Sequence, residues 1–96
     1  MELFERPSGG ERAVLVHVAF ESRPEQGEIE EFSELAKSAG AEPVALVTAS
    51  RSQPDPRTFV GSGKLEEIRE ILEANSGELV IFDHELSPGQ ERNIER

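Results

Sequence analysis

The chain has 96 residues, no cysteine and a formal net charge of −10, with 35% hydrophobic and 31% charged residues. This length allows one domain with a modest core, and the missing thiols exclude disulfides and thiolate metal sites. The acidic balance is opposite to that of a general nucleic-acid binder, which is normally basic.

The N-terminal segment, residues 1–12, is polar and contains two glycines, so we expect a flexible lead-in to one domain over residues 13–96. Its first residues are charged and lack the apolar core of a signal peptide. No apolar run in the chain approaches the roughly 20 residues that a membrane-spanning helix needs. We therefore expect a cytoplasmic location.

Two nearly continuous apolar runs, residues 13–20 and 44–49, are typical of strands buried on both faces, as in a parallel sheet. Between them, apolar residues in the range 29–39 recur at helical spacing. Gly40 follows where a helix C-cap residue belongs. Strand, helix and strand together predict a βαβ unit with a right-handed crossover.

The second half of the domain predicts a similar alternation. Residues 50–57 contain two prolines and predict an irregular loop, and residues 58–60 predict a very short strand. Apolar residues in the range 65–72 recur at helical spacing, and residues 79–82 predict another buried strand. The expected fold is therefore α/β, with a small, mostly parallel sheet of about four strands flanked by helices.

The last predicted element is a helix that begins at residues 87–90, Ser-Pro-Gly-Gln. This stretch has a capping-box signature with proline at the first helical position. The helix has barely two turns before Arg96 and no C-cap residue. We expect it to be truncated, in a chain cut from a longer protein.

Residues 61–64, Gly-Ser-Gly-Lys, precede a helix and look like a phosphate-binding loop. A P-loop needs a glycine five positions before its Gly-Lys pair and a serine or threonine after that pair. Thr58 and Leu65 occupy those positions. The dinucleotide fingerprint also fails, because Glu66 replaces its third glycine. Neither standard nucleotide motif is present.

Residues 51–64 nevertheless form the one basic window of the chain, with three bases against Asp55 alone. Free N–H groups at a helix start favour phosphate, and ligands of a parallel sheet gather beyond the C-terminal ends of its strands. An anion site and a simple tight turn remain alternative interpretations of the two glycines. The candidate residues for anion or RNA binding are Arg51, Arg57, Gly61, Ser62, Gly63 and Lys64.

The histidines do not predict catalysis. His17 lies inside the first strand, where a satisfied core residue is expected. Asp83 and His84 are adjacent in a strand and point to opposite faces, so they do not form an acid–base dyad by themselves. We expect Asp83 to help cap the loop before Ser87. Two histidines without cysteine argue against zinc, so we predict no catalytic and no metal-ligating residue.

Two longer motifs stand out in the second half of the chain. They are Thr-Phe-Val-Gly-Ser-Gly-Lys at residues 58–64 and the stretch at residues 79–93, which includes Phe-Asp-His and Ser-Pro-Gly-Gln. Both closely resemble the N-terminal domain of the HflX family of ribosome-associated GTPases. Residues 11–16 and 38–41 also match, so the resemblance covers nearly the whole chain. It implies a longer parent protein in which a helical hairpin and a GTPase domain follow this domain. That parent would hydrolyse GTP with Mg²⁺, associate with the large ribosomal subunit, and split or rescue stalled ribosomes under stress.

The chain contains neither a P-loop nor the Asn-Lys-x-Asp motif that reads guanine. The resemblance therefore implies a module that is not itself an enzyme and has no cofactor of its own. It would dock on ribosomal RNA and contact the GTPase domain of the same chain. The alternative is a small-molecule or nucleotide module that binds ATP or GTP at residues 61–64. A third hypothesis is that Lys64 pairs with an acid on the GTPase domain.

Overall fold

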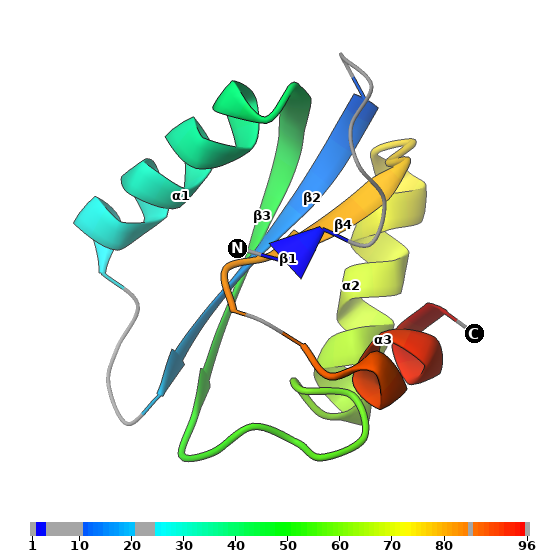
Figure 1. Ribbon diagram of the computed structural model, residues 1–96. Helices are drawn as coiled ribbons and strands as arrows, with labels where there is room; N and C mark the ends of the chain where they lie inside the picture. Colours follow the sequence, from blue (N-terminus) through cyan, green and yellow to red (C-terminus); the bar gives the residue numbers. More distant parts are fainter. Residues whose placement is uncertain (1, 4–10, 21–24, 85, 96) are drawn as a thin grey trace.

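The computed structural model describes residues 2–3, 11–20, 25–84 and 86–95, which form one layered α/β unit (Figure 1). The elements in chain order are β1 (Glu2–Leu3), β2 (Glu11–Phe20), α1 (Gln26–Ser38), β3 (Ala41–Arg51), α2 (Ser62–Ala74), β4 (Leu79–Phe82) and α3 (Pro88–Glu95). The predicted α/β class is confirmed. No helix in the described ranges is long and apolar enough to cross a membrane.

The sheet has the order β1-β4-β2-β3, with β2 parallel to both β3 and β4. β1 pairs antiparallel with β4 through only two residues. Residues 2–3, which we expected in the lead-in, thus form a short strand, and β2 begins at Glu11 rather than at residue 13. The rest of that lead-in, residues 1 and 4–10, lies outside the described residues.

The predicted strand at residues 58–60 is also wrong. Phe59 forms only an isolated bridge with Asp55 and has a φ of 69°, which is far from the extended conformation of a strand. The three parallel strands are therefore β2, β3 and β4. β3 is longer than expected and includes Pro43, which an edge strand tolerates because its outer N–H groups need no partner.

Helices cover both faces of the sheet, α1 on one side and α2 with α3 on the other (Figure 1). Alternate residues of β2 point to opposite faces, so this strand contributes to two cores. Ala13 and Leu15 pack with Phe32 and Ala36 of α1. The larger core joins the other face of β2 to α2 and α3. Its members in these three elements are Val14, Val16, Val18, Leu65, Ile68 and Ile94.

The outer surface of α1 is strongly acidic. It bears exposed side chains at Glu28, Glu30, Glu31 and Glu34, with Lys37 as the base near its end. On the other side of the sheet, the C-terminal end of β3 leads into the loop of residues 52–61, which ends at the first turn of α2. The predicted site residues all lie along this second path.

Candidate functional site

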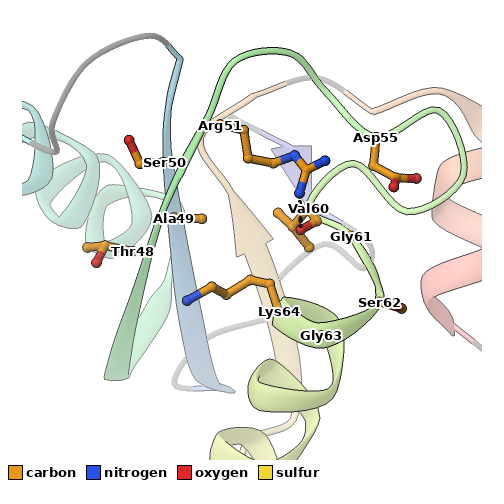
Figure 2. Close-up of a pocket in the computed structure, with 10 residues that line it drawn as sticks. All are labelled: Thr48, Ala49, Ser50, Arg51, Asp55, Val60, Gly61, Ser62, Gly63 and Lys64. Carbon is orange, nitrogen blue, oxygen red and sulfur yellow. Dashed lines mark hydrogen bonds between the residues drawn. The ribbon is translucent and has the colours of Figure 1, made fainter.

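A cavity of about 600 Å³ opens where the C-terminal end of β3 meets the first turn of α2 (Figure 2). Five of the six predicted anion-binding residues line it, and only Arg57 does not. The predicted residues thus gather around one concavity, while their role in binding an anion stays a prediction. Its lining residues are Thr48, Ala49, Ser50, Arg51, Asp55, Val60, Gly61, Ser62, Gly63 and Lys64.

Arg51 holds the two ends of the loop together. Its Nη1 donates to the carbonyl of Val60 at 3.0 Å, and its Nε donates to the carbonyl of Gln53 at 3.2 Å. Figure 2 shows the guanidinium directed at Val60 and Gly61 rather than out of the cavity. Arg51 therefore has a structural duty that the sequence did not reveal, while its positive charge still lies beside the cavity.

The two glycines of the motif have different roles. Gly61 has a φ of 86° and a ψ of 158°, a conformation that is essentially restricted to glycine. A Cβ built there would lie 2.8 Å from Nη1 of Arg51. Gly63 lies within α2, and a Cβ there would meet no atom of the described chain within 4 Å. Only Gly61 is required by the geometry of the turn.

The first turn of α2 offers backbone donors to the cavity. Leu65 donates the first helical hydrogen bond, to the carbonyl of Gly61 at 3.0 Å. The N–H groups of the three preceding residues, 62–64, have no earlier carbonyl of the helix to bond. Gly61 supplies no side-chain cap, and the first turn contains no acidic residue. The end of the helix dipole therefore favours an anion here.

Lys64 adds a side-chain charge at the same place. Its Nζ lies 2.6 Å from Oε2 of Glu67, and the two side chains are 28% and 48% exposed. Because solvent still reaches both side chains of this partly exposed ion pair, it contributes only about 0.2–1 kcal/mol. An incoming phosphate oxygen can therefore replace the Glu67 carboxylate as the partner of Lys64.

Asp55 makes the cavity asymmetric. Its Oδ1 accepts the N–H groups of Arg57 at 2.8 Å and Thr58 at 3.1 Å. These backbone hydrogen bonds lower the pKa of the Asp55 carboxyl below its usual value, so it stays charged. A second anion is repelled from that part of the rim. Within the cavity, Lys64 and the first turn of α2 are therefore the favoured place for a phosphate.

A second polar group lies at the end of β2, and the sequence did not predict its connections. His17 is only 2% exposed, and its Nδ1 bonds to the carboxylate of Asp83. Oδ1 of Asp83 accepts the N–H of Val18 at 3.1 Å, and Nε2 of His84 lies 2.7 Å from the carbonyl of Val18. Two histidines and one carboxylate thus attach the end of β4 to β2.

This group corrects two predictions. Among the described residues, both oxygens of Asp83 bond to β2 rather than to the loop before Ser87, where we expected Asp83 to act as a cap. His17 is a core residue as expected, but only its Nδ1 is satisfied. Its Nε2 has no hydrogen-bond partner among the described residues, and the nearest acid is Oε2 of Glu28 at 3.8 Å. Within the described ranges, no cluster of three or more candidate ligands could hold a metal.

Comparison of the sequence with known proteins shows the family to which the chain belongs. The family model described as GTP-binding GTPase N-terminal matches residues 26–96, a range that includes every residue lining the cavity. The chain belongs to this HflX N-terminal family. The resemblance inferred from residues 58–64 and 79–93 is confirmed.

Relatives named GTPase HflX align over three quarters or more of the chain. The GTPase HflX of Escherichia coli (strain K12) is 47% identical over 94 residues, which cover 98% of this chain and 22% of that protein. The GTPase HflX of Lacrimispora saccharolytica is 38% identical over 95 residues, with the same two coverages. The GTPase HflX of Thermococcus kodakarensis is 41% identical over 73 residues, 76% of this chain and 16% of its own length. The chain thus spans about a fifth of the length of these relatives.

Proposed function

We propose that this HflX N-terminal domain is a non-catalytic module that docks on the large ribosomal subunit by binding phosphates of ribosomal RNA. The observation that carries the proposal is the cavity between β3 and α2. There the only basic window of an acidic chain meets the uncapped start of a helix. RNA phosphates match that combination of lysine and backbone N–H groups.

The docking contacts follow from the individual side chains. Lys64 exchanges its bond to Glu67 for a phosphate oxygen, and the N–H groups of residues 62–64 bind the same phosphate. Arg57 is exposed on the adjoining loop and meets a neighbouring phosphate. Arg51 stays bound to the loop carbonyls, and its positive charge attracts the phosphate without a direct contact. With so few contacts, docking of the isolated domain is weak and salt-sensitive.

In this proposal the chemistry belongs to the rest of the parent protein. The chain has no P-loop and no Asn-Lys-x-Asp motif, so GTP and Mg²⁺ bind to a GTPase domain of the parent. The parent acts in the cytoplasm, where it splits or rescues stalled ribosomes under stress. The present domain supplies ribosome contact and positions the GTPase domain. Its membership of the HflX N-terminal family supports this division of labour.

Docking is tested by replacing Arg57 and Lys64, the two bases of the window that do not bond to the loop carbonyls as Arg51 does. We expect the double variant Arg57→Ala, Lys64→Ala to bind purified large ribosomal subunits about tenfold more weakly, for two contacts of about 0.7 kcal/mol each. The slope of log affinity against log salt should fall by roughly 1.4–1.8 for two lost phosphate contacts. Cosedimentation at several salt concentrations measures both quantities.

The matched control is the double variant Arg12→Ala, Lys37→Ala. It removes the same formal charge from exposed side chains at the start of β2 and the end of α1. We expect it to bind as the unaltered chain does. Equal affinity and equal salt slope for the two double variants would refute docking through this cavity.

The volume of the cavity also favours a second candidate, a small-molecule or nucleotide-binding module. Small-molecule sites commonly measure about 300–1,000 Å³, and the cavity at about 600 Å³ lies within that range. Calorimetric titration of the chain with ATP and GTP separates the two functions. Under the docking proposal we expect no saturable heat at micromolar nucleotide. A saturable heat that Lys64→Ala abolishes would assign the cavity to a nucleotide instead.

A further inference from the structure

The loop of residues 52–61 is a partly exposed segment that includes two residues with a positive φ, Phe59 and Gly61. Phe59 is its anchor, buried among aromatic rings but with a φ of 69°, an uncommon value for a bulky residue. Asp55 and Phe59 exchange two backbone hydrogen bonds, each 2.9 Å long. A conformation of this kind persists only when the surroundings enforce it, and part of the enforcement comes from α3.

Two side-chain amides of α3 donate to carbonyls of this loop. Nε2 of Gln90 donates to the carbonyl of Asp55 at 2.8 Å, and Nδ2 of Asn93 donates to the carbonyl of Arg57 at 3.0 Å. Positions 90 and 93 are three residues apart, so they lie on the same face of the helix. Each bond joins segments that are about 35 residues apart in sequence.

Both the oxygen and the nitrogen of the Gln90 side-chain amide form hydrogen bonds. Its Oε1 accepts the N–H of Ser87 at 2.9 Å, and Oγ of Ser87 accepts the N–H of Gln90 at 3.1 Å. The side chain is only 9% exposed. The predicted capping box is therefore present, and its glutamine has a second task that a capping role does not require.

We propose that Gln90 and Asn93 are positioning residues that couple the cavity loop to α3. Together they form an amide clamp, which fixes the rim of the cavity at Asp55 and the backbone of Arg57. A displacement of α3 must either move the loop with it or break these two bonds. The clamp thus makes phosphate binding depend on the position of α3. This last step rests on the proposed docking function, whereas the clamp itself does not.

Replacing each amide by the acid of the same shape breaks the bond to the loop while leaving the capping box of α3 intact. Gln90→Glu keeps an oxygen that can accept the N–H of Ser87, but it places a second oxygen against the carbonyl of Asp55. At a pH where the introduced carboxyl group is ionised, both facing oxygens are acceptors and cannot form a hydrogen bond. Asn93→Asp does the same at the carbonyl of Arg57. Gln26→Glu is the matched control, because it makes the same change at an exposed residue whose amide, among the described residues, bonds within α1 to Glu30.

Amide hydrogen exchange of the chain, followed by NMR, tests the clamp directly. We expect the amides of Asp55 and Phe59 to exchange at least about tenfold faster in Gln90→Glu than in Gln26→Glu, because local opening of the loop becomes easier. Asn93→Asp should show the same pattern. Amides in the middle of α2 and in β4 should be unchanged, which shows that the fold is retained. If loop exchange is unchanged in both clamp variants, the proposal is overturned.

Binding to purified large ribosomal subunits then tests the functional step. Asn93→Asp should weaken binding in the unaltered chain but not in an Arg57→Ala background, because a residue that acts through Arg57 is not additive with it. Equal losses in both backgrounds would overturn the coupling through Arg57. If the double variant Arg57→Ala, Lys64→Ala loses no affinity while loop exchange in Asn93→Asp still rises, the docking function fails and the clamp stands.

Discussion

Gly61→Ala will lower the free energy of unfolding by about 2 kcal/mol, the cost of holding a non-glycine residue in a sparsely populated backbone region. Gly63→Ala, two residues away, will leave it unchanged or raise it by up to about 1 kcal/mol. The difference arises because Gly61 has a φ of 86° and lies against Arg51, whereas Gly63 is helical with open space beside it.

Urea unfolding of both variants measures this difference, provided that the dependence of the unfolding free energy on urea concentration is the same in both. A change in the NMR spectrum of Arg51 at the cavity should accompany the loss of stability. A Cβ at position 61 would displace the Arg51 guanidinium from the carbonyl of Val60. The Nη resonances of Arg51 should therefore shift in Gly61→Ala and not in Gly63→Ala. Equal stabilities for the two variants would show that the turn does not require glycine at position 61.

Asp83→Ala will lower the free energy of unfolding by about 3 kcal/mol. It deprives two groups of their partner, Nδ1 of the buried His17 and the N–H of Val18. Each buried polar group left unpaired costs about 1–3 kcal/mol. Asp83→Asn should lose less, because its amide oxygen can still accept the N–H of Val18.

The control for this prediction is Glu66→Ala. It removes a carboxylate that is 65% exposed and lies 3.8 Å from Nη1 of Arg69, and the expected loss is less than about 1 kcal/mol. Denaturant unfolding at neutral pH gives all three values. A loss for Asp83→Ala no larger than that for Glu66→Ala would mean that the bonds from Asp83 to β2 add nothing to stability.

The fold was predictable wherever hydrophobic periodicity determines the structure. The apolar runs of β2 and β4 and the helical stripes of α1 and α2 predicted four elements within a few residues. β1 could not be predicted, because two residues carry no periodicity and their pairing with β4 is a tertiary event. The error at residues 58–60 has a local cause, since a positive φ at a bulky Phe59 leaves no mark in composition.

In the site, too, the features set by neighbouring residues were predictable from the sequence, and those set by long-range contacts were not. Strand-to-helix order brought Arg51 and the glycine turn to one edge, and the cavity lies there. The hydrogen bonds from Arg51 to the loop were not predictable from the sequence, because they are made to backbone carbonyls, which every residue has. The bond from Asp83 to His17 has no local sequence signal, because the two residues are 66 positions apart. The spacing of Ser87 and Gln90 predicts a cap, but the bond from Gln90 to the Asp55 carbonyl spans 35 positions and has no such signal.

The acidic surface of α1 has a consequence for how any polyanion can approach. α1 lies on the face of the sheet opposite to α2 (Figure 1), and four exposed glutamates give that face a negative potential. A polyanion that meets α1 is repelled, whereas one that meets the edge between β3 and α2 reaches Lys64 and Arg57. Under the proposed docking on RNA, this distribution of charge weakens encounters through α1 and favours approach at the edge between β3 and α2.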